Sequence, residues 1–269
     1  MFIRAVVLAI VATFPAVSIV QAVQLDVRND KVPPSMRFEW HSELPVTACG
    51  QSCRRWISAV GPITDQTPGD FQAFAANESV HGTTLVLDSG GGSVAATLTL
   101  GRAIRELGMN TTVGRTVINR NGQPGAATIS SEGRCSSMCV FLLLAGVKRH
   151  VSSSAEIFVH QIWITSKRNK ILANTYDAED VARIERDIGK LARYTAEMDG
   201  SAELLEIALQ VPAWGAMHRL SSEELRRVHL DTTDDVFDAR PAPATAAKAA
   251  PPVADALSTP IEGAATRNN

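Results

Sequence analysis

The sequence predicts an α/β fold in which a largely parallel sheet is flanked by helices. Short apolar stretches alternate with helical stretches through the middle of the 269-residue chain, which is the order expected of successive strand–helix units. Apolar residues make up 45% and charged residues 20%, so a packed globular core is expected. In such sheets, sites lie at the carboxyl ends of the strands. The best candidates for a functional site are therefore the loops around 88–93, 116–137 and 160 onward.

The strands are expected to be short and to end in polar or glycine-rich turns. They are predicted near 36–40, 54–64, 83–93 (where the strand runs into a glycine turn), 110–117, 148–152, 156–163 and 232–237. Helices are predicted over 67–79, 93–108, 136–146, 174–200, 201–210 and 220–230. A long Gly/Ser/Asn loop is expected over 119–133, and loops of that length often carry function.

Three helix ends carry recognisable signals. Thr67 can cap the helix in which Pro68 occupies the first position. Gly108 closes the helix that begins at 93. Ser221-x-x-Glu224 is the pattern of a capping box. These signals fix where the helices should begin and end.

The two ends of the chain differ from the middle. Residues 1–22 contain Arg4, then an apolar stretch, and then small residues typical of a cleavage site after Ala22. This pattern predicts a signal peptide. An uncleaved membrane anchor is the alternative. Residues 239–269 are rich in Ala and Pro and are expected to be disordered. A single α/β domain over 23–238 is therefore expected to be periplasmic or secreted, without stable membrane insertion after cleavage.

The charge and the cysteines narrow the class of protein. The formal net charge of −2, without clusters of Lys or Arg, argues against a nucleic-acid partner. The four cysteines, Cys49, Cys53, Cys135 and Cys139, form two C-x3-C pairs. In an exported protein they predict two disulfides with three possible connectivities. A four-cysteine zinc site is the alternative, although it normally uses C-x2-C spacing.

Two stretches could carry chemistry. The turn "DSGGGS" at 88–93 lets backbone N–H groups face a ligand, although it matches no phosphate-loop pattern and could be only a tight turn. Ser136 and Ser137 stand at the start of a helix, where a serine is either a cap or a nucleophile. His160, at the end of an apolar strand, is either structural or the base that such a nucleophile needs.

Together these stretches resemble the ClpP peptidase family of the ClpP/crotonase superfamily. The resemblance rests on "LVLDSGGGSVAATLTLGRAIRELG" (85–108) followed by "SSMCVFLLLAGVKRHVSSSAEIFVHQ" (136–161), and it extends over roughly 54–235. The chain is more closely similar to exported, uncharacterised ClpP-like proteins with a Cys-x-Ser-x-Cys motif. The resemblance implies a ClpP/crotonase-like ββα superhelix.

The family roles carry over residue by residue. Ser137, which precedes Met as in the family, matches the nucleophile, and His160 matches the general base. The backbone N–H groups of Gly92 and Met138 match the oxyanion hole, while Gly90 and Gly91 match the substrate-binding turn. Ser136 is the less favoured nucleophile. The resemblance implies a peptide or protein substrate and no cofactor or metal.

The chain departs from the family at the third triad position. Met217 occupies the place of the family's aspartate. In a well-studied triad, losing that carboxylate costs about 10⁴-fold in turnover. His160 could instead be held by a backbone carbonyl, by an acid such as Asp187 or Asp199, or by nothing.

The implied fold also bears on the disulfides. It places Cys53 and Cys139 at opposite edges of the sheet, roughly 20 Å apart for a strand of ordinary length. That distance exceeds the reach of a disulfide. Local pairs, Cys49–Cys53 and Cys135–Cys139, are therefore favoured.

Three functions follow from the resemblance. The first is an exported serine hydrolase, most simply a peptidase, and the second is an inactive module that binds peptides or assembles with partners. The third, a crotonase-like acyl-CoA enzyme, is disfavoured by the export signal. The amphipathic helix over 174–198 could mediate a homo-oligomer, as long helices do in the family, or simply cover the sheet with a solvated charged face.

Overall fold

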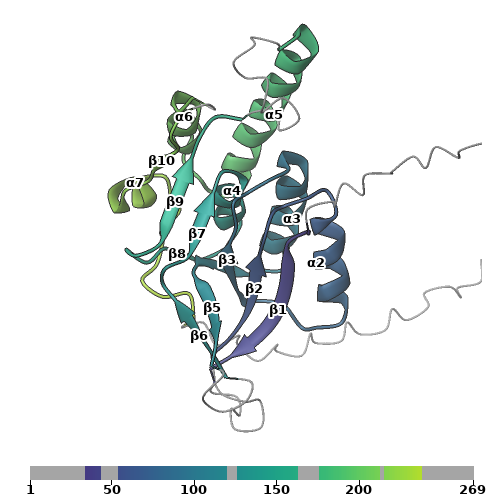
Figure 1. The fold of residues 1–269 in the computed structure, drawn as a ribbon, viewed down its shortest axis with the longest axis vertical. Helices are drawn as coiled ribbons and strands as arrows, with labels where there is room; N and C mark the ends of the chain where they lie inside the picture. The colour runs from purple at the N-terminus through teal and green to yellow at the C-terminus, as the bar shows by residue number, and fades with distance from the viewer. Residues whose placement is uncertain (1–33, 44–53, 120–125, 163–175, 213–214, 238–269) are drawn as a thin grey trace, which may run out of the picture. The chain divides into compact units, whose positions relative to one another are not determined.

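The computed structural model describes residues 34–43, 54–119, 126–162, 176–212 and 215–237. The predicted signal peptide, Cys49, Cys53 and the Ala/Pro-rich tail lie outside the described residues. Within them the protein is a mixed α/β fold, in which sheets of mostly parallel strands are flanked by helices (Figure 1). None of the described helices is both long enough and apolar enough to cross a membrane.

The main sheet has five strands in the order β1-β2-β3-β4-β8. They are β1 (Arg37–Ser42), β2 (Arg55–Val60), β3 (Thr84–Asp88), β4 (Asn110–Val113) and β8 (Arg149–His150). β1 pairs with β2 antiparallel, and the remaining neighbours pair parallel. The helices that connect parallel strands must cross over a face of the sheet.

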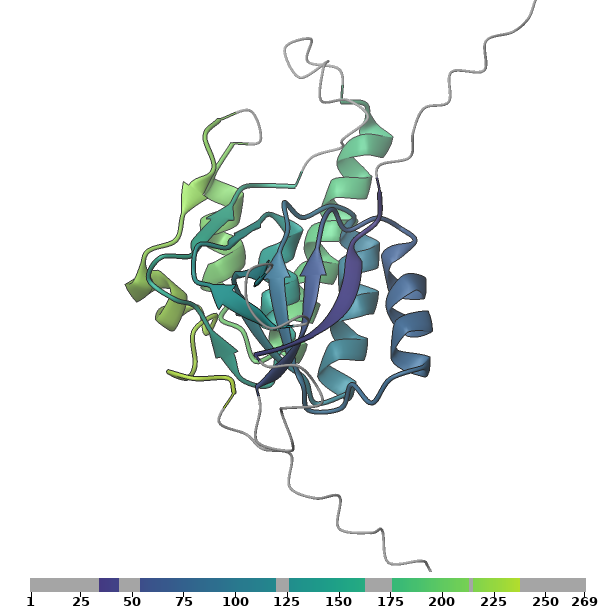
Figure 2. The same cartoon turned by 60° about the horizontal axis from the view of Figure 1, so that its bottom comes forward.

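The two faces of this sheet are covered differently. Ile57 and Leu85 point into the large core that lies under helices α2 (Thr67–Ala76), α3 (Val94–Glu106) and α4 (Met138–Leu144). Trp56 and Val86, one position away on the same strands, point to the other face and pack on Ala127. Figures 1 and 2 show the hairpin of β5 (Arg115–Ile118) and β6 (Ala127–Ser130) on that second face. The alternation of side chains along a strand therefore fills two separate apolar layers.

A second, three-stranded sheet continues from the end of β3. It consists of β7 (Arg134–Ser136), β9 (Glu156–Val159) and β10 (His218–Arg219), with β7 and β9 parallel and β10 antiparallel to β9. A parallel bridge between Ser89 and Cys135 links it to the chain leaving β3. The carboxyl ends of β3, β7 and β9 thus lead into neighbouring turns.

Three further helices complete the described fold: α5 (Ala178–Glu197), α6 (Glu203–Gln210) and α7 (Ser222–Arg227). α5 is joined to α4 by the buried Tyr194, whose hydroxyl donates to the Phe141 carbonyl at 3.0 Å. Burial raises the pKa of this phenol, so it stays protonated and donates at neutral pH. The predicted capping box of Ser221 and Glu224 is confirmed at the start of α7.

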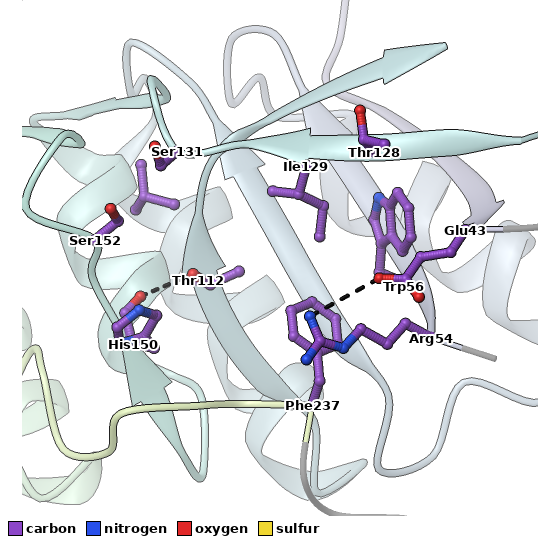
Figure 3. Close-up of a pocket in the computed structure, with 11 residues that line it drawn as sticks. Glu43, Arg54, Trp56, Thr112, Thr128, Ile129, Ser131, His150, Ser152 and Phe237 are labelled. Carbon is purple, nitrogen blue, oxygen red and sulfur yellow. Dashed lines mark hydrogen bonds and ion pairs between the residues drawn. The ribbon is translucent and has the colours of Figure 1, made fainter. Parts of the chain in front are cut away.

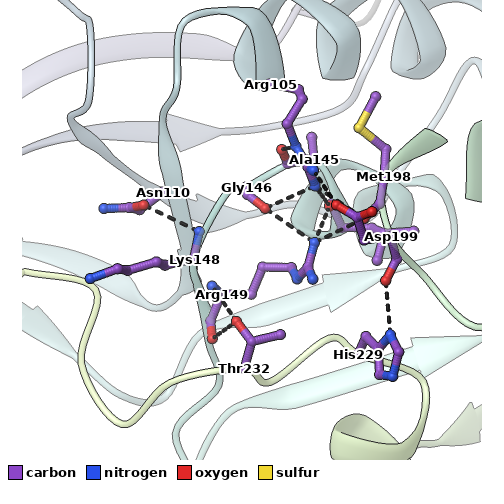
Figure 4. Close-up of polar contacts among 11 residues, drawn as sticks. Arg105, Asn110, Ala145, Gly146, Lys148, Arg149, Met198, Asp199, His229 and Thr232 are labelled. Atoms are coloured by element: carbon purple, nitrogen blue, oxygen red, sulfur yellow. Dashed lines mark hydrogen bonds and ion pairs between the residues drawn. The ribbon is translucent and has the colours of Figure 1, made fainter.

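Two arginines close the C-terminal end of α4 (Figure 4). Arg105 of α3 and Arg149 of β8 both donate to the carbonyls of Leu144, Gly146 and Met198. Arg105 also donates to the carbonyl of Ala145 and pairs with Asp199 at 2.9 Å. Burial and the neighbouring Arg105 lower the pKa of Arg149 to about 10, so Arg149 keeps its charge at neutral pH.

Several local predictions are wrong. Thr67 is the first residue of α2 rather than its cap, and its hydroxyl accepts from the N–H of Thr64. The predicted strand over 110–117 is divided at Gly114 into β4 and β5. Part of the predicted loop over 119–133 is β6, which pairs with β5.

The strand predicted over 232–237 is also absent from the described structure. The carbonyl of Val236 instead accepts hydrogen bonds from the side chains of Thr84 and Asn110. This segment is therefore held by hydrogen bonds from side chains of the main sheet and not by a ladder of backbone hydrogen bonds.

Candidate functional site

The glycine turn after β3 lies against the start of α4. Gly91 has φ +90° and Gly92 has φ +153°, conformations that side chains disfavour. A Cβ on Gly91 would lie 2.6 Å from the Ser136 carbonyl oxygen, 2.8 Å from the Met138 nitrogen and 2.9 Å from the Ser137 Cβ. The turn and the first residues of α4 therefore approach so closely that only a glycine fits between them.

The other side of the turn is held by the loop that follows β2. The N–H of Ile63 donates to the Gly91 carbonyl at 2.9 Å, and the N–H of Ser93 donates to the Ile63 carbonyl at 2.8 Å. A Cβ on Gly92 would overlap that same carbonyl of Ile63. Ser93 then caps α3 by accepting from the N–H of Ala96. The turn is thus fixed on both sides, while Gly90, with nothing within 4 Å of where its Cβ would be, faces open space.

Ser137 connects β7 to α4 in a strained conformation. Its φ of 57° and ψ of −125° lie outside the regions that non-glycine residues normally adopt. Among residues 135–146 it alone is not buried, because the sharp turn raises it out of the apolar run around it. Its side chain does not cap the helix. A strained serine on a strand-to-helix turn is typical of nucleophiles.

Two backbone donors are available beside Ser137. Met138 is the first residue of α4, and the first N–H groups of a helix have no acceptor within the helix. The N–H of Gly92 donates to no backbone carbonyl in the described part of the chain, whereas the N–H of Ser93 does. The Met138 nitrogen lies at the close approach of Gly91 to the start of α4, and Gly92 is the next residue of the same turn. The arrangement can bind a negatively charged oxygen formed at an acyl group on Ser137.

Ser136 is placed differently from Ser137. Its side chain is 2% exposed, and its hydroxyl accepts from Nε of Arg134 at 3.1 Å. The guanidinium of Arg134 in turn lies 4.7 Å from the centroid of the Phe158 ring. Ser136 is therefore a buried, partnered residue, and Ser137 is the better nucleophile of the two.

His160 lies at the end of the strand next to the one that leads to Ser137. β7 and β9 pair in parallel with Ser136 opposite Phe158, and the N–H of Ser137 donates to the Phe158 carbonyl at 2.9 Å. Nδ1 of His160 lies 2.7 Å from the carbonyl oxygen of Gln161. No hydrogen bond joins Ser137 to His160 in the described structure. Catalytic hydrogen bonds are often long in unliganded enzymes and shorten when substrate binds.

Neither acid considered for His160 pairs with it in the described structure. Asp187 pairs with Lys190 at 2.9 Å, and Asp199 pairs with Arg105 at 2.9 Å. Met217 directly precedes β10 and is 38% exposed. Of the arrangements considered from the sequence, the structure therefore contains the one in which a backbone carbonyl contacts the imidazole.

Cys135 and Cys139 form a disulfide, with their Cα atoms 5.3 Å apart. This confirms the predicted local pairing for these two residues. Both side chains are fully buried, on either side of Ser137 in the sequence. The bond links the last residues of β7 to the first turn of α4 and so closes the loop that contains the strained serine.

A cavity among the described residues lies elsewhere, on the face covered by the β5–β6 hairpin (Figure 3). It has a volume of about 370 Å³. Residues of β2, β4, β6 and β8 line it together with Phe237, and the guanidinium of Arg54 lies 5.4 Å from the centroid of the Phe237 ring. None of the site residues predicted from the sequence is among its lining residues. It therefore belongs to the packing between sheet and hairpin rather than to the candidate site.

Two contacts of the site could not be identified from the sequence. Gln161 stands in the His-Gln pair, but nothing in the sequence indicates that its carbonyl contacts the imidazole. Arg134 belongs to no recognisable motif, and its bond to Ser136 follows from the pairing of β7 with β9.

Neither a protein-family model nor a curated protein sequence matches this chain.

Proposed function

We propose that the protein is an exported ClpP-like serine hydrolase, most simply a peptidase, that acts in the periplasm or outside the cell. Ser137 is the nucleophile and His160 the general base. The N–H groups of Gly92 and Met138 form the oxyanion hole, and the turn at Gly90 and Gly91 receives the peptide. The proposal includes a ClpP/crotonase-like fold, and needs no metal or cofactor.

The strained backbone conformation of Ser137, which is only half-buried within a buried stretch, is the observation that carries this proposal. A serine that served only as a helix cap would adopt extended backbone angles and accept a bond from its own helix, as Ser93 does. Ser137 does neither. The glycine turn packed against it supports the same role, because a side chain on Gly91 would displace the backbone around Ser137 and Met138.

The reaction follows from these positions. The Oγ of Ser137 attacks the acyl carbon, and its proton passes to Nε2 of His160 as the new C–O bond forms. The carbonyl oxygen becomes an oxyanion that accepts from Gly92 and Met138. The C–N bond then breaks, Nε2 returns the proton to the departing amine, and water releases the acyl group from Ser137 by the same route.

A fluorophosphonate probe for serine hydrolases tests the proposal. Wild-type protein is compared with Ser137→Ala, His160→Ala and the matched control Ser136→Ala, and the labelled peptide is mapped by mass spectrometry. Label on Ser137 in the wild type and in Ser136→Ala, but in neither of the other variants, is expected. A peptide library then distinguishes a peptidase from other acyl hydrolases.

The second candidate is an inactive ClpP-like module that binds peptides or assembles with partners. The presence of Met217 in the place of a catalytic acid favours it. A folded wild-type protein that no fluorophosphonate labels, yet which binds peptides from the same library, would support this candidate over the hydrolase.

A further inference from the structure

We propose that the backbone carbonyl of Gln161 replaces the missing catalytic carboxylate, which makes Gln161 a positioning residue for His160. The inference rests on the proposed hydrolase function, because it names the group that orients the general base of that reaction. It explains how a serine–histidine pair could work with a methionine at the third position.

The contact fixes the tautomer of the imidazole. The carbonyl oxygen of Gln161 lies 2.7 Å from Nδ1 of His160. A carbonyl can only accept, so Nδ1 has to carry the proton in this hydrogen bond. The neutral ring then has its lone pair on Nε2, which is the nitrogen that must take the proton from Ser137. Orienting the ring in this tautomer is one of the two tasks of a triad carboxylate.

Gln161 is itself held at two points. Its N–H donates to the carbonyl of Val211 at 3.0 Å, and its side-chain Nε2 donates to the carbonyl of Leu209 at 3.2 Å. Both acceptors belong to the C-terminal end of α6, where carbonyls lack partners within the helix. The carbonyl that contacts His160 is thus anchored to a helix rather than to the turn alone.

The pairing of β10 with β9 suggests where a side chain at position 217 would lie. His218 pairs with Val159, and continuing this register by one position beyond the end of both strands would set Met217 opposite His160. The N–H of Leu220 donates to the Ile157 carbonyl, which makes that pair hydrogen-bonded and makes the Met217 position a non-hydrogen-bonded one. Side chains are closest in such pairs. A carboxylate at 217 would therefore compete with the Gln161 carbonyl for Nδ1.

The second task of a triad carboxylate is to stabilise the imidazolium. A carbonyl does this less well than a carboxylate, because it carries only a partial negative charge. The charged side chains on the neighbouring strands are already paired: His218 with Glu224 at 2.9 Å and Arg219 with Glu156 at 4.0 Å. Arg134 on β7 donates to Ser136. An acid introduced at 217 should thus stabilise the imidazolium form of His160 and increase reactivity.

The kinetic test measures the fluorophosphonate labelling rate of Ser137 against pH. The proteins are wild type, Gln161→Ala, Met217→Asp and the double variant. Gln210→Ala is the control, because Gln210 is an exposed glutamine at the end of α6, the helix to which Gln161 is bonded. Gln161→Ala should lower the rate about 10-fold to 100-fold, since misplacing a catalytic group by about 1 Å has an effect of that order.

Met217→Asp should restore the rate in the double variant and move the acid limb of the profile to higher pH. A folded Gln161→Ala protein with the wild-type rate, or one that Met217→Asp does not rescue, would overturn the proposal.

A second measurement is independent of reactivity. Nitrogen NMR of protein labelled with ¹⁵N-histidine, with His160→Ala for assignment, reports which ring nitrogen is protonated. The wild type should have the Nδ1-protonated tautomer and Gln161→Ala should lose that preference. An Nε2-protonated His160 would overturn the inference even if Ser137 is labelled. A wild type that does not label but has the Nδ1 tautomer would instead contradict the proposed function.

Discussion

The two ends of helix α4 are completed in opposite ways. At the C-terminal end, two arginines donate to three shared carbonyls, so the last turn has more donors than a helix end requires. At the N-terminal end, Ser137 is strained and half-buried, and its side chain does not cap the helix. Every helix leaves unpaired N–H and C=O groups at its ends. In α4 the carbonyls at the C-terminal end accept from two arginines, whereas the Ser137 side chain accepts from no N–H at the N-terminal end.

The N-terminal end of α7 makes the contrast sharper. There Ser221 and Glu224 form a capping box that satisfies the first donors. Ser221 and Glu224 thus satisfy two donors at the start of α7, whereas no side chain caps the start of α4. Four sets of substitutions test how these helix ends affect stability and the proposed reactivity of Ser137.

The largest effect is expected at the arginine end. Because Arg105 and Arg149 donate to the same three carbonyls, either one can compensate for the loss of the other. Replacing either by Met should lower the free energy of unfolding by about 1–2 kcal/mol, and replacing both by about 5 kcal/mol, because buried carbonyls then lose all donors. Urea unfolding of the four proteins measures this. A double variant that only adds the two single effects would contradict shared donation.

Gly91→Ala tests the opposite end. The new methyl group would lie within 3 Å of three atoms of Ser136, Ser137 and Met138, and at φ +90° the substitution is also strained. We expect the labelling rate of Ser137 to fall about 10²–10³-fold, the range for disturbing an oxyanion hole. Gly189→Ala, at a helical position in α5 with open space around it, is the control and should keep the wild-type rate. Equal rates in the two variants would show that the turn is not part of the site.

The Cys135–Cys139 disulfide connects the strained serine to both flanking elements. Replacing both cysteines by Ala should lower the free energy of unfolding by about 2 kcal/mol, as expected for so short a loop. It should also slow labelling of Ser137 about 10-fold, because the turn is no longer closed covalently. Thermal unfolding and labelling are measured on the same preparation. Loss of stability with an unchanged labelling rate would limit the disulfide to a structural role.

The smallest effect is expected at the capped helix. Burial alone would raise the pKa of Glu224, but hydrogen bonds from Ser221 and His218 outweigh it and lower the pKa. A lowered carboxyl pKa stabilises the fold above the ordinary value of 4.5, and this stabilisation is lost as the pH falls below it. Glu224→Gln should therefore cost about 0.5 kcal/mol at pH 7 and progressively less toward pH 3. Labelling of Ser137 should not change. A stability difference that grows toward acid pH would show the opposite sign.

Much of this arrangement could be predicted from the sequence because it depends on local patterns. The apolar strands, the glycine turn and the capping box of Ser221 are short-range signals, and the structure contains each of them. The local Cys135–Cys139 pair is present as well. The order of the strands then brings the turn at Gly91 beside Ser137 without further information.

The remaining features depend on pairing between distant segments. The β5–β6 hairpin lies partly in a Gly/Ser/Asn stretch whose composition predicts a loop, and only its partner strand makes it a strand. The contact of Gln161 with His160 depends on the end of β9 and on the end of α6, to which Gln161 donates two hydrogen bonds. The hydrogen bonds of Arg105 and Arg149 to shared carbonyls connect α3, β8, α4 and α5, and no local sequence pattern indicates that these elements meet.

The most direct test of the open N-terminal end of α4 is a crystal structure of the protein with a peptide boronic acid. Boron bonds covalently to a nucleophilic serine and imitates the tetrahedral intermediate. We expect a bond from boron to Oγ of Ser137 and a boronate oxygen about 2.7–3.1 Å from the nitrogens of Gly92 and Met138. A boronate on another residue, or one on Ser137 whose oxygens contact neither donor, would contradict it.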